Sequence, residues 1–163
     1  MRRLAFSALV IALLAGTPSA QAQETKTPDP LGDLMMSALS GALPGTVDWK
    51  LKATLYHAGA KGVGNLDSLG CKVVAMRTAA VDGLNVKRRT VLFIKETVGL
   101  PMPDGAKHDG FWYASDTGGA IKNGRIDLYT GDGKGSMKPL MPFNLATLTV
   151  SKVGDFKGCP PKN

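Results

Sequence analysis

Residues 115–129 read SDTGGAIKNGRIDLY, and the interpretation of the whole chain starts from them. They contain two carboxylates, Asp116 and Asp127, that lie eleven positions apart. Gly118 and Gly119 follow the first carboxylate directly, and glycine tolerates positive φ and the close approach of another backbone segment. The chain can therefore turn back after Asp116, so we expect the two carboxylates to lie on neighbouring segments.

The second half of this segment has the pattern of a β-strand. In residues 125–129 apolar and polar side chains alternate, so Ile126 and Leu128 share one face and Asp127 lies on the other. If the aliphatic pair packs in the core, Asp127 faces a groove or solvent. Two acids on adjacent backbone segments are suited to acid/base chemistry on a glycosidic bond.

The segment resembles the signature of the 3D domain, a family named for its three aspartates. This domain occurs in the membrane-bound lytic transglycosylase A family and in related bacterial cell-wall proteins. The matching positions are Ala114, Asp116, Gly118, Gly119, Ala120, Ile121, Lys122, Asp127, Leu128 and Tyr129. Asp82 resembles the third aspartate, and the resemblance extends over about residues 73–150. It implies a mainly β fold, a small six-stranded double-psi β-barrel, which we expect over residues 46–163.

The resemblance also implies a reaction, the non-hydrolytic cleavage of the β-1,4 bond between N-acetylmuramic acid and N-acetylglucosamine in peptidoglycan, which leaves a 1,6-anhydro product. It assigns Asp127 as the catalytic acid and base, with Asp116 raising its pKa and Asp82 completing the hydrogen-bonded floor. The residues expected to contact substrate are Gly118, Gly119, Lys122 and Tyr129. No cofactor is expected.

Two other functions stay open. The chain could be a non-catalytic module that binds cell-wall glycan, or a barrel that docks another envelope protein through a helix at residues 31–43. In the strand expected at residues 47–57, Trp49 and Tyr56 either pack in the barrel or lie near a sugar groove, where aromatic faces stack on pyranose rings.

The N-terminal segment has the pattern of an export signal. Residues 1–22 begin with Arg2 and Arg3, continue with an apolar core, and end in a small-x-small cleavage site after Ala22. We therefore expect a periplasmic or secreted protein, with no membrane-spanning segment once the signal is removed. A disordered leader is expected at residues 23–30 and a short amphipathic helix at residues 31–44.

Cys71 and Cys159 are the only cysteines in the chain. In an oxidising compartment such a pair is expected to form a structural disulfide, which would tie the C-terminal tail to the barrel. A metal or redox pair is the alternative, although the chain has no CxxC motif.

Charge and composition argue against other functions. The chain has 20 basic and 13 acidic residues, a formal net charge of +7, but aromatic residues make up only 6%. A nucleic-acid interface needs a concentrated basic face with interleaved aromatics, so no nucleic acid is expected as a partner. His57 and His108 have no carboxylate or cysteine at ligand spacing, and no metal site is proposed.

The remaining β pattern predicts a closed barrel. Strands are expected at residues 47–57, 71–81, 90–97, 111–114, 125–129 and 145–153. Between them, residues 99–110 and 129–141 are rich in glycine, proline or lysine and are expected to be loops.

Overall fold

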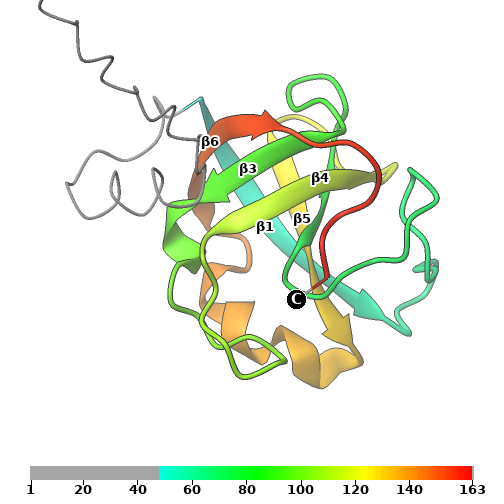
Figure 1. Cartoon of the computed structure of the whole chain (residues 1–163), viewed down its shortest axis with the longest axis vertical. Coiled ribbons are helices and arrows are strands. Elements are labelled where there is room, and N and C mark those ends of the chain that lie inside the picture. The colour runs from blue at the N-terminus through cyan, green and yellow to red at the C-terminus, as the bar shows by residue number, and fades with distance from the viewer. Residues whose placement is uncertain (1–47, 163) are drawn as a thin grey trace, which may run out of the picture.

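The computed structural model describes residues 48–162, which form a closed barrel of six strands (Figure 1). The strands are β1 (Trp49–Ala58), β2 (Thr78–Val81), β3 (Thr90–Ile94), β4 (Phe111–Thr117), β5 (Arg125–Asp132) and β6 (Thr147–Asp155). The predicted signal, leader and amphipathic helix lie outside these residues. Among the described residues, no helix combines the length and the apolar character needed to cross a membrane.

The barrel is mixed, and its order around the wall is β1-β5-β2-β4-β3-β6. β1 pairs with β5, and β2 with β4, in parallel, whereas the other neighbours are antiparallel. Closure leaves no strand with an unpaired edge. The predicted mainly β, closed six-stranded barrel is confirmed.

Alternation along the strands builds the core. Ile126 and Leu128 are fully buried, as their spacing in β5 predicts, and they pack with the inward residues of the other strands. Trp112 of β4 is the largest fully buried side chain, and its indole N–H donates a 3.0 Å hydrogen bond to Thr97 Oγ1. Satisfying this polar group lets the large ring occupy the interior at no hydrogen-bonding cost.

The disulfide between Cys71 and Cys159 is present, as predicted, with 5.5 Å between the Cα atoms. It joins the segment before β2 to the tail after β6, and Figure 1 shows this tail (red) running back across the barrel. The bond closes a loop of 88 residues, so on the chain-entropy model it restricts the unfolded state by about 4–5 kcal/mol.

Three predicted segments differ in the structure. The strand expected at residues 71–81 is confined to Thr78–Val81, because Val74 and Thr78 close a turn in which the Thr78 N–H donates to the Val74 carbonyl at 2.9 Å. The loop expected at residues 129–141 is instead the end of β5 followed by a 3-10 helix, η2 (Lys134–Phe143). The strand expected at residues 90–97 ends at Ile94, and its last three residues form a shorter 3-10 helix, η1 (Lys95–Thr97).

Candidate functional site

A row of outward-facing residues crosses four neighbouring strands and forms the centre of the site. Asp127 of β5 pairs with Thr54 of β1 on one side and with Ala80 of β2 on the other. Ala80 in turn pairs with Asp116 of β4. Paired residues of adjacent strands point to the same face of a sheet, so the order across the barrel wall is Thr54, Asp127, Ala80, Asp116.

The two carboxylates therefore flank one small side chain. Asp116 and Asp127 are separated by two strand spacings, about 10 Å between Cα atoms, and each extends over Ala80. Ala80 is 4% exposed and forms the floor between them. The chain brings the two carboxylates onto one face of the barrel, but β2 lies between their strands, which were expected to be neighbours. The positive φ angles of the connection from β4 to β5 are those of Asn123 and Gly124, not of Gly118 and Gly119.

A β-bulge aims Asp116 to this face. Ala79 pairs with Ala114, but Ala80 pairs with Asp116, so Ser115 is an extra residue in β4. Trp112 and Ala114 point into the core, and strict alternation would have turned Asp116 inward with them. The extra residue reverses this parity and moves the carboxylate to the outer face.

A cavity of about 600 Å³ opens over this row. Asp116, Asp127 and Ala80 line it together with Thr117, residues 118–121 after β4, and Tyr56 near the end of β1. The other lining residues come from the segment between β1 and β2, namely Lys61, Gly62, Val63, Gly64, Leu66, Asp67, Ser68 and Val73.

Asp116 is held by donors on both carboxylate oxygens. The Tyr56 hydroxyl donates to Oδ2 at 3.2 Å, and the Ser68 backbone N–H donates to Oδ1 at 2.9 Å. The Thr117 N–H adds a third donor to Oδ1 at 2.8 Å. Arg88 extends the network, because its Nη1 donates to the Ser68 carbonyl at 3.0 Å. The Asp116 carboxylate is thus fixed in position by residues from three segments of the chain.

Asp127 has the opposite environment. Its Oδ1 is buried and has no hydrogen-bond partner among the described residues. Burial raises the pKa of Asp127, the charge of Asp116 raises it further, and the hydroxyl of the adjacent Thr54 partly opposes this. A carboxyl in such surroundings keeps its proton to higher pH than an exposed one and can donate it.

Tyr56 hydrogen-bonds Asp116 and lines the cavity that contains both carboxylates. Its pKa is raised, first by burial and then by the charge of Asp116 and the hydrogen bond to it, with smaller contributions from Asp127 and Asp67. The phenol therefore stays protonated at neutral pH and remains a donor to Asp116. Its ring contacts Tyr129, with 5.2 Å between the ring centroids.

Asp67 is a third carboxylate at the cavity. It is 6% exposed, and its Oδ1 accepts hydrogen bonds from the N–H groups of Leu69 at 3.0 Å and Cys71 at 2.8 Å. Its Oδ2 is buried without a partner among the described residues. The sequence analysis did not single out Asp67, because Asp-Ser in a glycine-rich stretch is also the usual composition of a surface turn.

Asp82 does not line this cavity. Its Oδ1 accepts hydrogen bonds from the N–H groups of Leu84 and Asn85, at 3.0 and 2.9 Å, and its Oδ2 accepts one from the Asn85 side chain at 2.6 Å. Burial alone would raise the pKa of Asp82, but these bonds outweigh it and hold the pKa below the ordinary value. In this geometry the carboxylate closes the turn that follows β2.

Of the four residues predicted to contact substrate, two line this cavity and two do not. Gly118 and Gly119 line the cavity, and a Cβ added at Gly119 would meet no atom within 4 Å. Lys122 is exposed and does not line it. Tyr129 lines a second, larger cavity on the other side of its contact with Tyr56.

The structure adds Tyr56 to the site and places Trp49, the other aromatic of β1, against the core. The sequence left both roles open for both residues. The sequence signal that could have identified Tyr56 as a site residue is the alternation in β1, which puts Tyr56 on the same face as Thr54. Within residues 48–162, no group of three His, Cys, Asp or Glu side chains is placed to hold a metal ion.

Comparison with known families gives one direct match. Residues 77–138 match the family model described as the 3D domain, which confirms the predicted resemblance. A search of curated protein sequences found no match.

Several solved structures of lytic transglycosylases are similar over part of the chain. MltA from Escherichia coli is 20% identical, with a TM-score of 0.41, over 60% of this chain and 29% of that one. LtgG of Burkholderia pseudomallei is 23% identical, with a TM-score of 0.37, over 58% of this chain and 28% of that one. A membrane-bound lytic murein transglycosylase from Agrobacterium tumefaciens is 24% identical, with a TM-score of 0.39, over 56% of this chain and 26% of that one. This chain thus spans less than a third of their length.

Proposed function

We propose that this chain, which carries a 3D domain, is an exported lytic transglycosylase that cleaves the β-1,4 bond between N-acetylmuramic acid and N-acetylglucosamine. The observation that carries the proposal is that Asp127 lines a cavity together with Asp116 while its Oδ1 is buried without a partner among the described residues. A carboxyl with a raised pKa in an open cavity is suited to general acid catalysis.

In the proposed first step, Asp127 donates its proton to the glycosidic oxygen as the bond from that oxygen to C1 of the muramic residue breaks. The sugar ring then carries positive charge in an oxocarbenium-like state. Asp116 lies two strands away on the same face, and its carboxylate is held by Tyr56 and Ser68. A fixed negative charge at this distance favours the cationic ring without having to move.

In the second step, the Asp127 carboxylate takes the proton from the C6 hydroxyl of the same muramic residue. O6 then forms a bond to C1, and the 1,6-anhydro ring closes. The proton that Asp127 gave to the leaving oxygen is thereby replaced, so the residue returns to its starting state and no water is consumed. Because one carboxyl performs both transfers, the reaction needs no nucleophilic carboxylate.

The supporting residues have distinct proposed roles. Gly118 and Gly119 leave room for the sugar beside Asp116, and Tyr56 holds that carboxylate. Lys122 and Tyr129 remain proposed substrate contacts at the margins of the site. We assign Asp82 a positioning role, since it closes the turn that ends β2, the strand between the two catalytic carboxylates.

Export to the periplasm or beyond is part of the proposal. The disulfide between Cys71 and Cys159 supports it, because structural disulfides form and persist in oxidising compartments. Intact-mass analysis of the protein recovered from its native compartment tests the expected cleavage after Ala22. A recovered mass that still includes residues 1–22 would contradict this part of the proposal.

The reaction is tested by incubating purified sacculi with the wild-type protein and with Asp127→Asn, which keeps the shape of the side chain but removes its proton transfer. Asp155→Asn is the matched control, because Asp155 lies on β6 with an exposed carboxylate. We expect 1,6-anhydro muropeptides from the wild type and the control but not from Asp127→Asn. Binding to sacculi without release by any of them would instead identify a glycan-binding module, and the absence of both would favour a protein-docking role.

A further inference from the structure

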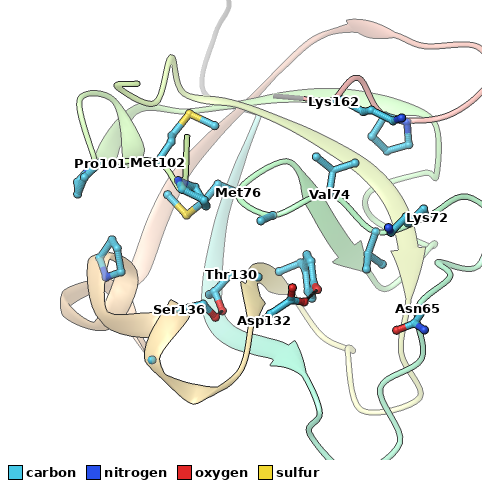
Figure 2. A pocket seen from close by; sticks show the side chains of 18 of the residues that line it. Asn65, Lys72, Val74, Met76, Pro101, Met102, Thr130, Asp132, Ser136 and Lys162 are labelled. Carbon is cyan, nitrogen blue, oxygen red and sulfur yellow. Dashed lines mark hydrogen bonds between the residues drawn. The ribbon is translucent and has the colours of Figure 1, made fainter. Parts of the chain in front are cut away.

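The larger cavity of the described residues, about 1050 Å³, lies beside the candidate site and is not used by the proposed reaction (Figure 2). Its walls come from the segment before β2, the loop around Pro101, the end of β5, η2 and the C-terminal tail. Figure 2 places Met76 and Met102 on one side of it and Lys72 and Lys162 on the other. A cavity of this volume accommodates a ligand of several hundred daltons.

Its lining combines apolar walls with uncompensated positive charge. Eight of its twenty lining residues are valine, methionine or proline, and three are lysines, Lys72, Lys138 and Lys162. Within residues 48–162 none of the three makes an ion pair. The only acidic lining residue is Asp132, which accepts a hydrogen bond from the Tyr129 hydroxyl at 3.4 Å. The complementary ligand is therefore a small, partly apolar molecule with more than one carboxylate.

The two cavities adjoin. Val73 lines both, Asn65 lines the larger one, and its neighbour Leu66 lines the smaller one. The contact between Tyr56 and Tyr129, with 5.2 Å between ring centroids, forms part of the wall that separates them. A ligand with a sugar over Asp127 and a branch of several atoms can reach from one cavity into the other across this wall.

We propose that the larger cavity binds the acidic peptide that branches from the muramic residue of the glycan. This inference rests on the proposed function and names the part of the substrate that the catalytic cavity leaves unbound. The lysines would face the peptide carboxylates, and the apolar wall its small side chains. Thr130 and Ser136 also line the cavity, and their hydroxyls are hydrogen-bonded to each other at 2.7 Å and to the backbone carbonyls of Tyr56 and Gly133.

The disulfide builds one wall of this peptide site. Cys159, Pro160 and Lys162 line the cavity, and the tail that contains them is joined to Cys71. Reduction of the disulfide frees this tail, so peptide affinity falls on reduction. The catalytic row of Asp127, Ala80 and Asp116 lies on three paired strands that do not include the tail, so the strand pairing that aligns the row stays in place.

Peptide binding is measured without turnover, by calorimetry with the stem peptide released from purified muropeptides and with the same peptide after amidation of its carboxylates. We expect the free-acid peptide to bind the wild-type chain and Asp127→Asn equally. The double variant Lys72→Gln/Lys138→Gln should weaken this binding by at least about tenfold, as loss of charge-assisted contacts requires. Lys95→Gln is the control, because Lys95 is exposed on η1 and lines neither cavity.

Two glycine substitutions, one in each cavity, test which cavity binds the peptide. Gly135 lines the larger and Gly119 the smaller, and a Cβ at either meets no atom within 4 Å. Gly135→Phe should abolish peptide binding, and Gly119→Phe should leave it unchanged while blocking binding of peptide-free glycan. Equal binding of the acid and amidated peptides, or no binding of either, overturns the inference. The inference is also overturned if the protein does not bind the peptide but binds phosphatidylglycerol vesicles through the same lysines.

The two proposals fail in different ways. Peptide binding with the expected lysine dependence, but no 1,6-anhydro product from sacculi, contradicts the proposed reaction and leaves the peptide site supported. Release of 1,6-anhydro product by a chain that does not bind the peptide contradicts the peptide site alone.

Discussion

Asp116 of β4 and Asp127 of β5 both pair with the same residue of β2, the strand that lies between β4 and β5. That residue is Ala80, the smallest side chain that still completes the barrel wall. The arrangement brings two acids that are eleven positions apart in the sequence onto one outer face and leaves an open space between them. Their environments then diverge, because Asp116 is fully hydrogen-bonded and Asp127 Oδ1 is buried without a partner among the described residues.

Removing the charge of Asp127 should stabilise the protein while it abolishes activity. A buried carboxyl with a raised pKa contributes stability at low pH that is lost as the pH rises through the raised pKa. Asp127→Asn carries no such charge, so its Tm should exceed that of the wild type by a few degrees at neutral pH. The difference should shrink as the pH falls below the ordinary carboxyl range. A lower Tm for the variant at neutral pH, measured by calorimetry, would contradict this account of Asp127.

Enlarging Ala80 should close the catalytic space. Ala80→Val places two methyl groups between Asp116 and Asp127, and we expect activity on sacculi to fall by about two orders of magnitude, since misplacement of about 1 Å has effects of that size. Ala79→Val is the matched control because Ala79 faces the core with no exposed surface. The control should lose about 1–3 kcal/mol of unfolding free energy through overpacking. An Ala80→Val variant with normal activity would show that the space over Ala80 is not where the sugar binds.

Tyr56→Phe tests the link between β1 and Asp116. The change removes the donor to Asp116 Oδ2 and leaves the ring in contact with Tyr129. We expect a loss of about 0.5–1.5 kcal/mol in unfolding free energy, measured by urea titration, together with about a tenfold fall in kcat/KM. Unchanged kinetics with the expected loss of stability would limit Tyr56 to a structural role.

The tyrosines also give a prediction for alkaline pH. Burial is the first cause of the raised pKa of Tyr56, Tyr113 and Tyr129, which are all the tyrosines of the chain. Their contribution to stability is present below the ordinary phenol pKa and is lost as the pH rises through the raised values. Phenolate absorbance should therefore develop at higher pH in the native protein than in urea. Coincident native and unfolded titration curves would be inconsistent with the burial of these rings.

The disulfide should account for a large part of the stability. Replacing Cys71 and Cys159 together with serine removes a constraint of about 4–5 kcal/mol on the unfolded chain. We expect a comparable decrease in the free energy of unfolding in urea, with little change in the far-UV spectrum of whatever fraction remains folded. A decrease below about 1 kcal/mol would mean that the tail is held by its packing instead.

The part of the fold that follows alternation was predictable from the sequence. Ile126 and Leu128 point inward and Asp127 outward as the period of two requires, but the positive φ angles between β4 and β5 are at Asn123 and Gly124, not at the glycines directly after Asp116. The alternation of inward and outward side chains is interrupted at Ser115, where a bulge in β4 turns Asp116 to the outer face. The local sequence does not encode this bulge, because it depends on pairing with β2, more than thirty positions upstream.

The contacts that complete the site could not be predicted from local sequence patterns either. Tyr56 and Ser68 reach Asp116 across 60 and 48 positions of sequence. Their alignment is a consequence of the parallel pairing of β1 with β5 and of the disulfide-anchored segment before β2. Asp82 was assigned from resemblance alone, and its hydrogen bonds with the turn that follows β2 became visible only with the structure.

The central claim is that burial and the charge of Asp116 raise the pKa of Asp127. The most direct test is a pH titration of the Asp127 carboxyl carbon by NMR, assigned with Asp127→Asn. In the wild-type protein we expect a midpoint above the ordinary aspartate range, and in Asp116→Asn a midpoint that moves back towards it. A wild-type midpoint within the ordinary range, unaffected by Asp116→Asn, would contradict the account.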